Sequence, residues 1–306
     1  MKKDFLTLLD RSPEELKWLI DEAILMKKER LAGILHNTHL AGKSIALVFE
    51  KSSTRTRVSF DVGVSELGGH PLYLLGTDIQ LGRGESIKDT ARVLSRYVHM
   101  IMIRTFAHSR VEELAEYASV PVINGLTDEY HPCQIMADVM TFYEHFSKYH
   151  GIKVAYIGDG NNIAHSWLNG AARFGFNLAI ASPKGYEPNK DIVRTAISEA
   201  KKTGANILIT DDPAEAAKDS DVVTTDVWAS MGQESDVASK SEQLRPYQVN
   251  AALMKFTGKD SVFLHCLPAH KGEEVTEEVF ESLSSFVFEE AENRLHVQKA
   301  IMKSII

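Results

Sequence analysis

The segment Ser53–Arg57, with the sequence STRTR, places hydroxyl and guanidinium side chains directly after the apolar run SIALVF and at the start of a helical pattern. Ser53 or Thr54 can cap that helix, and the free N–H groups of its first turn, together with the helix dipole, favour a negative ligand. Arg55 and Arg57 are unfavourable in the first turn of a bare helix, but they become favourable when an anion neutralises them. A solvated helix cap is the simpler alternative. We interpret the segment as a phosphate pocket.

Three more hydrogen-bond donors follow other apolar runs. Arg104 comes directly after MIMI, and His131 and Gln134 flank Pro132 at the start of a helical pattern in YHPCQ. Proline suits a first helical turn, so this stretch has a purely structural interpretation as well. Ligands of open parallel sheets, however, bind beyond the carboxyl ends of the strands, where these donors would converge. Convergent donors suit a developing oxyanion.

Polar groups follow the apolar runs of the second half too. Asp226 and Ser230 lie in DVWASMGQE, after DVVTT, and Cys266 lies in HCLPAHKGEEV, after SVFL. A carboxylate in this position suits a substrate amine. Asn161 and Asn162, in GDGNN, either contact a small ligand or are ordinary turn asparagines.

Three stretches resemble familiar ligand-binding motifs, but each lacks a feature that its motif requires. GKS at Gly42–Ser44 precedes a strand, and Asn37 stands where a P-loop has its first glycine. GDGNNIA begins at Gly158 after a strand, but Ile163 takes the place of the third glycine of a dinucleotide fingerprint. HCLP sets a histidine beside a cysteine, but adjacent side chains point apart and no paired C-x-x-C exists. We therefore predict no cofactor and no metal.

The scaffold that must position these residues is predicted from alternating patterns. Short β-branched runs alternate with helical patterns along the chain, which indicates parallel strands joined by crossover helices. The expected strands are 44–49, 71–75, 100–104, 120–124, 152–158, 177–182, 206–210, 221–225 and 261–265. The expected helices include one opened by the capping box Ser12–Glu15, then 55–67, 86–97, 110–118, 131–146 and a last one from about residue 290.

The expected fold class is α/β, with two domains that are each a mainly parallel sheet flanked by helices, and a C-terminal helix that completes the chain. Because SKYHG ends a helix and precedes a second series of strands, we place the first domain at 1–149 and the second at 150–289. The helix at about 290–306 is expected to pack back on the first domain.

Composition limits the classes of function. A chain of 306 residues suits two domains, and a formal net charge of −8 with mixed signs argues against a nucleic-acid partner. The two cysteines favour a reducing compartment, and no apolar run approaches the ~20 residues of a membrane span. We expect a cytoplasmic protein with no membrane partner.

Together these stretches resemble the aspartate/ornithine carbamoyltransferase family along essentially the whole chain. The motifs that carry the resemblance, in order, are FEKSSTRTRVSF, GESIKDTARVLSRY, MIRTF, HPCQ, GDGNN, DVWASMGQE, HCLPAHKGEEV and AENRLHVQKA. The first and fourth are shared with the aspartate branch, whereas DVWASMGQE and HCLP indicate the ornithine branch. Ser52 departs from the pattern, since many relatives have proline there.

The resemblance implies transfer of the carbamoyl group of carbamoyl phosphate to the δ-amine of L-ornithine, which gives L-citrulline and phosphate. It implies a reaction without metal, through a tetrahedral intermediate stabilised by Arg and His donors. The catalytic residues that it implies are Arg104, His131, Asp226 and Cys266. The substrate-binding residues that it implies are Ser53, Thr54, Arg55, Thr56, Gln80, Arg104, His131, Gln134, Asn162, Asp226, Ser230, Met231, Cys266, Leu267 and Arg294.

The resemblance also implies a homotrimer, or an assembly of trimers, with Gln80 reaching the site of a neighbouring subunit and Arg57 supporting the phosphate pocket. Two rival functions stay open from the residues themselves. An aspartate carbamoyltransferase would need cations for a second carboxylate, where DVWASMGQE offers a carboxylate instead. A non-catalytic anion-binding protein would explain STRTR but not the donors at Arg104 and His131.

Overall fold

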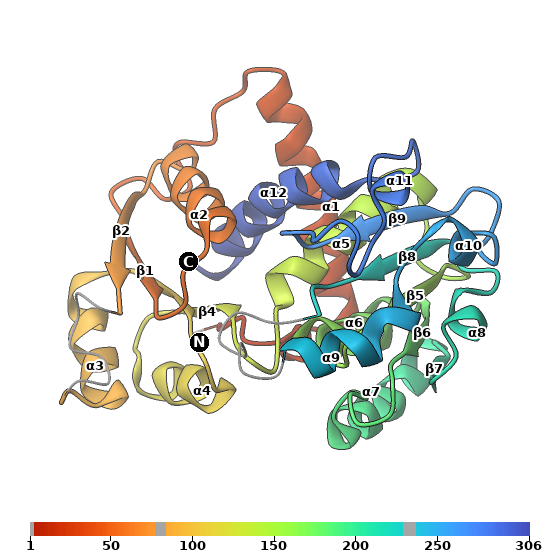
Figure 1. Ribbon diagram of the computed structural model, residues 1–306. Helices are drawn as coiled ribbons and strands as arrows, with labels where there is room; N and C mark the ends of the chain where they lie inside the picture. The colour runs from red at the N-terminus through yellow and green to blue at the C-terminus, as the bar shows by residue number, and fades with distance from the viewer. Residues whose placement is uncertain (1–2, 77–83, 229–236) are drawn as a thin grey trace. The chain divides into compact units, whose positions relative to one another are not determined.

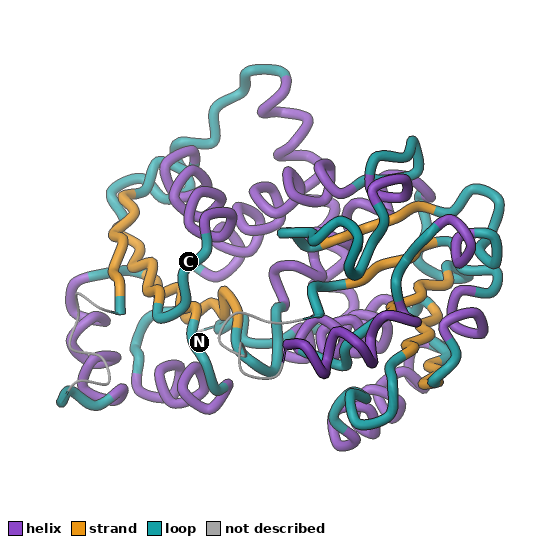
Figure 2. Tube along the Cα trace, in the orientation of Figure 1, coloured by secondary structure: helices purple, strands orange, loops and turns teal. Residues whose placement is uncertain are grey.

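The computed structural model describes residues 3–76, 84–228 and 237–306, and it divides the chain into two compact units. The first unit comprises Met1–Met140 and Glu292–Ile306, and the second comprises Thr141–Ala291. Each unit is a sheet flanked by helices, as the orange strands and purple helices of Figure 2 show.

The sheet of the first unit has four parallel strands in the order β2-β1-β3-β4. The strands are β1 Ser44–Phe49, β2 His70–Leu75, β3 Met100–Arg104 and β4 Val122–Leu126. Residues of β1 and β3 are buried throughout or almost throughout, because helices cover both faces of a parallel sheet. All four strands therefore end at one edge, where polar residues from distant parts of the sequence can meet.

Helices enclose this sheet (Figure 1). They are α1 Pro13–Leu31, α2 Thr54–Glu66, α3 Ile87–Tyr97 and α4 His108–Tyr117, with the short 3₁₀ turn η1 Leu8–Asp10, the first part of α5 Pro132–Phe146 and most of α12 Val287–Ile305. One core joins Ala46 and Val48 of β1 to Ala91 of α3 and Val111 of α4. Alternate residues of β1 face this core because side chains of a strand alternate between its two faces.

The C-terminal helix α12 packs closely on α2. A Cβ at Gly63 of α2 would lie 3.2 Å from Met302 Cε of α12, so the two helices approach each other closely there. Lys299 of α12 is fully buried, and its ammonium lies 2.6 Å from the Glu66 carboxylate and 3.0 Å from His36 Nδ1. These buried polar contacts hold the last helix against the first unit.

The second unit contains five parallel strands in the order β7-β6-β5-β8-β9. They are β5 Lys153–Ile157, β6 Asn177–Ala181, β7 Ile207–Thr210, β8 Val222–Thr225 and β9 Val262–His265. The chain order reverses at β5, where β6 lies on one side and β8 on the other. In open α/β sheets a reversal of this kind is where ligands bind.

The helices of this unit pack around the sheet. They are α6 Asn162–Phe174, α7 Lys190–Thr203, α8 Pro213–Ala217, α9 Val237–Leu244, α10 Ala251–Met254 and α11 Glu277–Phe280, with the 3₁₀ turn η3 Arg245–Tyr247 and the last part of α5. A second core joins Ile157 of β5 and Phe263 of β9 to Trp228, Tyr247 and Phe280.

The predicted α/β fold with two parallel sheets is confirmed, with shifts at a few element ends. The strand expected at 120–124 is found at Val122–Leu126. It begins after Pro121, which has no N–H for a ladder, although its carbonyl accepts from Ile101 N. The last helix starts at Val287 rather than near residue 290, because the buried Val287 belongs to its first turn.

Every helix within the described ranges is too short or too polar to cross a lipid bilayer.

Candidate active site

Ser53 caps α2 as the sequence predicts. Its backbone is extended, and its hydroxyl accepts a hydrogen bond from Thr56 N at 3.3 Å. Thr56 itself is fully buried, and its hydroxyl accepts from Arg294 Nη2 of α12 at 2.7 Å. Thr54 is exposed at the first position of the helix, and Arg55 is half-buried. The helix N-terminus and a buried arginine from the far end of the sequence thus lie together.

Arginines surround His131, which lies just before α5. Its imidazole is buried, and burial holds its pKa well below the usual value, with further lowering by the positive charges of Arg294, Arg104 and Arg55. A histidine in such a field stays neutral near pH 7 and keeps one N–H donor. Three sequence-predicted arginines and the predicted histidine therefore form one strongly positive cluster, which suits an anionic ligand.

Strand register places Arg104 in this cluster. Arg104 ends β3 and is paired with Phe49 of β1, and its carbonyl accepts from Glu50 N at 2.9 Å. The Glu50 carboxylate accepts hydrogen bonds from the Thr105 hydroxyl and from Arg110 Nη2, the latter at 2.7 Å. Glu50 thus links the end of β1 to residues that follow β3, a contact that the sequence interpretation missed.

Gln134 and Arg57 have other partners in addition to any ligand. The buried Gln134 donates from Nε2 to Asp138 Oδ1 one turn later in α5, at 2.8 Å. Arg57 is exposed, and its guanidinium stacks on the ring of Tyr73 in β2, 3.6 Å from the ring centroid. The guanidinium of Arg57 therefore packs against β2.

In the second unit, register brings Asp226 and Cys266 together. Thr225 of β8 is paired with His265 of β9, so the next residue of each strand lies at the same edge. Cys266 Sγ lies 3.0 Å from Asp226 Oδ1, which also accepts from Val227 N at 2.8 Å. Asp226 is buried and Cys266 half-buried, so the pair forms a partly accessible thiol–carboxylate site.

His265 supports the turn that follows β9. Its Nδ1 accepts from Leu267 N at 2.9 Å, so the ring proton is on Nε2, which donates to buried Glu274 at 3.2 Å. The backbone N–H of His265 donates a hydrogen bond to the Glu290 carboxylate at 2.8 Å. Leu267 has a left-handed backbone with φ of 57°, followed by a cis peptide to Pro268. His265 therefore holds the Cys266–Leu267 turn, and its side chain points away from the thiol, as predicted.

The turn between β5 and α6 lies beside Asp226. Asn161 caps α6, and its amide Nδ2 donates to Asp226 Oδ2 at 2.7 Å. Asn162, the predicted ligand, is the first residue of α6 and is half-buried. Lys240 of α9 donates to Asp159 Oδ2 at 2.6 Å, and burial raises the pKa of Asp159 while Lys240 opposes that rise. These contacts fix the turn.

Three predicted site residues, Gln80, Ser230 and Met231, lie outside the described residues. Among the residues that are described, one group has metal-ligand spacing, namely His270, Glu273 and Glu274. Two of these three are exposed, and Glu274 already accepts from His270 N.

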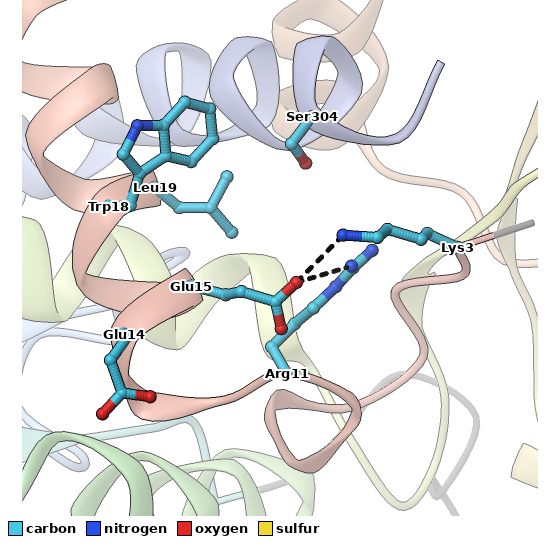
Figure 3. A pocket seen from close by; sticks show the side chains of 7 residues that line it. All are labelled: Lys3, Arg11, Glu14, Glu15, Trp18, Leu19 and Ser304. Carbon is cyan, nitrogen blue, oxygen red and sulfur yellow. Dashed lines mark hydrogen bonds and ion pairs between the residues drawn. The ribbon is translucent and has the colours of Figure 1, made fainter. Parts of the chain in front are cut away.

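A pocket of about 350 Å³ lies elsewhere in the first unit, against α1 and the end of α12 (Figure 3). Its lining residues are Lys3, Arg11, Glu14, Glu15, Trp18, Leu19 and Ser304. Both of its cations are paired with Glu15, at 3.1 Å for Lys3 and 3.6 Å for Arg11. None of the predicted site residues lines this pocket.

Two family models match the chain. One, described as the carbamoyl-P binding domain of aspartate/ornithine carbamoyltransferase, matches residues 3–144, and the other, described as the Asp/Orn binding domain, matches residues 150–305. The chain belongs to the aspartate/ornithine carbamoyltransferase family, which confirms the resemblance predicted from the motifs.

Individual relatives carry a more particular name. The chain is 55% identical over 304 residues to the ornithine carbamoyltransferase of Anoxybacillus flavithermus, covering 99% of this chain and 96% of the relative. It is 54% identical to that of Bacillus subtilis, covering 99% and 94%. The structure matches that of ornithine carbamoyltransferase from Pyrococcus furiosus with a TM-score of 0.96 and 48% identity, covering 100% of this chain and 97% of that one.

Proposed function

We propose that this enzyme is an ornithine carbamoyltransferase, which transfers the carbamoyl group of carbamoyl phosphate to the δ-amine of L-ornithine and releases L-citrulline and phosphate. The observation that carries the proposal is the pairing of Asp226 with Cys266 at 3.0 Å, within a unit whose family model is that of the Asp/Orn binding domain. A carboxylate suits an amine, whereas an aspartate substrate would need cations for its second carboxylate.

Carbamoyl phosphate is proposed to bind at the first unit, with its phosphate at the N-terminus of α2. The Ser53 cap leaves N–H groups of the first helical turn directed at the ligand, and Thr54, Arg55 and Thr56 lie on that turn. The arginines that, after burial, lower the pKa of His131 support this role, since they would also attract a phosphate dianion. The unit's family model, for carbamoyl-P binding, points the same way.

Arg104, His131 and Gln134 are proposed to hold the carbamoyl group. Neutral His131 can donate one hydrogen bond and Arg104 a charge-assisted one, which both strengthen as the carbonyl oxygen becomes an oxyanion. Arg294, held on the Thr56 hydroxyl, adds positive charge to the same cluster. Carbamoyl phosphate is an activated acyl donor, so these donors and correct orientation carry the chemistry, and orientation alone contributes ~7–11 kcal/mol in favourable cases.

L-Ornithine is proposed to bind at the second unit. Asn162, Asp226, Ser230, Met231, Cys266 and Leu267 are the proposed contacts. The δ-amine must lose a proton before it attacks, and the Asp226 carboxylate and Cys266 are the groups proposed to orient it. The departing phosphate, held by Arg55, is proposed to accept a proton at the end of the transfer.

A homotrimer, or an assembly of trimers, in which Gln80 serves the site of a neighbouring subunit is part of the proposal, and its support is the family resemblance. The proposed location is the cytoplasm, and the two cysteines, both free, support a reducing compartment.

The test is a citrulline assay with carbamoyl phosphate and three amine substrates offered in parallel, namely ornithine, aspartate and putrescine. Product from ornithine alone supports the proposal. Carbamoyl-aspartate or carbamoyl-putrescine as the main product would reassign the substrate, and a protein that binds carbamoyl phosphate without any turnover would be the non-catalytic alternative.

A further inference from the structure

Both oxygens of the Asp226 carboxylate are held by neighbours in the second unit. Oδ1 accepts from Cys266 Sγ at 3.0 Å and from Val227 N at 2.8 Å. Oδ2 accepts from Asn161 Nδ2 at 2.7 Å. The last contact is short for an amide donor and joins a neutral group to a charged one, and such bonds are stronger than neutral pairs. Of the two side chains that hold this carboxylate, only Cys266 is among the proposed substrate contacts.

The orientation of the Asn161 amide is fixed by its other contacts. Its Oδ1 accepts from Ile163 N at 2.9 Å and Ala164 N at 3.4 Å, the first turn of α6. The buried Tyr156 hydroxyl lies 3.2 Å from the same oxygen and 2.8 Å from the Asp159 carbonyl, so its proton is shared between two acceptors. Because the oxygen faces these donors, the Nδ2 group must face Asp226.

Capping alone does not require this arrangement. Asn189 caps α7 in the same unit, accepting from Asp191 N at 2.9 Å and Ile192 N at 3.4 Å, the same distances as at Asn161. Asn189 is exposed, whereas Asn161 is half-buried and its Nδ2 group donates a hydrogen bond to Asp226. The two asparagines share one structural role and differ in the contact to the carboxylate.

We propose that Asn161 is a positioning residue for the ornithine amine, because its Nδ2 group holds the Asp226 carboxylate in one orientation. The inference rests on the proposed function, because Asp226 is taken to orient the ornithine δ-amine. Tyr156 acts on Asn161 rather than on Asp226, because its hydroxyl contacts Asn161 Oδ1 and keeps that amide from rotating. Asn161 therefore governs the amine substrate and leaves carbamoyl phosphate binding unaffected.

Two substitutions separate positioning from capping. Asn161→Ser keeps an N-cap hydroxyl but cannot reach Asp226, so kcat/KM for ornithine should fall about 10- to 100-fold, the range for a hydrogen bond to a charged group. The affinity for carbamoyl phosphate, measured by calorimetry without ornithine, should stay within about twofold of the parent, since a cap replacement costs little.

Asn161→Asp gives a pH signature. Asp is as good a cap as Asn, but its second oxygen would face Asp226 Oδ2, and two carboxylates this close share one proton. The singly protonated pair restores the hydrogen bond, so ornithine turnover relative to the parent should be highest at low pH and fall as pH rises and that proton leaves. The surrounding titratable groups, Tyr156, Cys266 and Asp159 with Lys240, are common to both proteins, so the ratio isolates the new pair.

Asn189→Ser and Asn189→Asp are the matched controls. They should leave both kcat/KM for ornithine and the affinity for carbamoyl phosphate unchanged at every pH. If the parent makes citrulline and both Asn161 variants behave like their Asn189 counterparts, the positioning role is overturned. If the parent makes no citrulline from ornithine, the proposed function fails instead. If Asn161→Ser does not fold, the near-isosteric Asn161→Asp variant provides the test. The ratio of its ornithine turnover to that of the parent should fall as pH rises, which would support the inference. A ratio that does not change with pH would overturn it.

Discussion

Arg55 and Arg57 lie two residues apart in the first turn of α2, yet their side chains have different surroundings. Arg55 contributes to the positive field around His131, whereas Arg57 is exposed and stacks on Tyr73. The sequence alone gives both residues the same anion-binding interpretation, because a pattern of residue types does not encode the direction of a side chain. In the structure Arg55 lies near His131, whereas Arg57 contacts Tyr73.

The first prediction follows from that difference. Arg55→Ala should weaken carbamoyl phosphate binding by about 1.5–3 kcal/mol, the scale of a hydrogen bond to a charged group, as measured by calorimetry. Arg57→Ala, which removes one charge from the same helical turn, is the control and should change the affinity much less. Equal losses in the two variants would mean that only the overall charge matters, and would remove Arg55 from the phosphate site.

The second prediction concerns the carboxylate. Asp226→Asn keeps the shape but removes the charge, so kcat/KM for ornithine should fall by roughly 10- to 150-fold, or about 1.5–3 kcal/mol of transition-state stabilisation. Carbamoyl phosphate affinity should stay close to that of the parent. Steady-state kinetics with ornithine varied, together with calorimetry of carbamoyl phosphate, measure the two quantities. A similar loss of kcat/KM for ornithine and of carbamoyl phosphate affinity would show that the substitution disturbs the fold rather than the contact with the ornithine amine.

Some contacts around the site could not be predicted from residue types. Glu50, Tyr156 and Lys240 are not marked by a motif. Glu50 and Lys240 act through partners far along the sequence, as Lys240 does with Asp159. Asp226 and Cys266 were predictable, because each directly follows an apolar strand and parallel strand ends meet at one edge. Their 3.0 Å contact depends on the register of β8 with β9, which the sequence does not reveal.

At the scale of elements, α12 contains an unusual buried histidine. His296 is fully buried, and within the described part of the chain neither ring nitrogen has a hydrogen-bond partner. Burial, together with the nearby positive charges of Lys299, Lys27 and Arg30, lowers its pKa to about 4, while Glu66 opposes this shift. The folded protein therefore binds a proton at His296 much less readily than the unfolded chain does, whose histidines titrate near pH 6.5.

The sign of the pH effect follows. Above about pH 6.5 the ring is neutral in both states, so stability is complete there; as pH falls towards 4 the unfolded state takes up the proton first, and stability is lost. His296→Leu should therefore show a shallower decline of the free energy of unfolding between pH 6.5 and 4, by up to about 1.4 kcal/mol per pH unit.

Denaturant unfolding at several pH values measures this difference. The other histidines with lowered pKa values, His39, His108 and His131, titrate alike in parent and variant and so cancel in the comparison. Parallel pH profiles for the two proteins would contradict the prediction. The variant should remain folded at pH 7, because leucine fills a buried site without any polar group to satisfy.

Elements were predictable wherever apolar periodicity was strong. β1 and β3 match the runs SIALVF and MIMIR residue for residue, and the capping box at Ser12 starts α1 as expected. The errors fall at ends, as at β4, where Pro121 interrupts the apolar run, and at α12, whose first turn contains residues that also fit a strand. End positions depend on tertiary packing, which local patterns do not carry.

At the scale of the whole molecule, the proposed trimer with shared sites makes a fourth prediction. Gln80→Ala and Arg104→Ala variants should each be inactive, but subunits mixed after reversible dissociation should regain activity, since some sites then contain neither change. Light scattering should report a mass that is a multiple of three chains. No recovery after confirmed exchange of subunits, measured with differently tagged chains, would mean that each chain forms a complete site by itself.

The first unit is built from both ends of the sequence, Met1–Met140 and Glu292–Ile306, whereas the second is one uninterrupted segment. Because synthesis runs from the N-terminus, the whole second unit is translated before Arg294 and Lys299, which contact Thr56 and Glu66 of the first unit. The second unit can therefore fold before most of α12, which completes the first unit, has been synthesised. The N-terminus of α2, which carries the STRTR segment, is thus made long before the α12 residue that contacts its Thr56 hydroxyl.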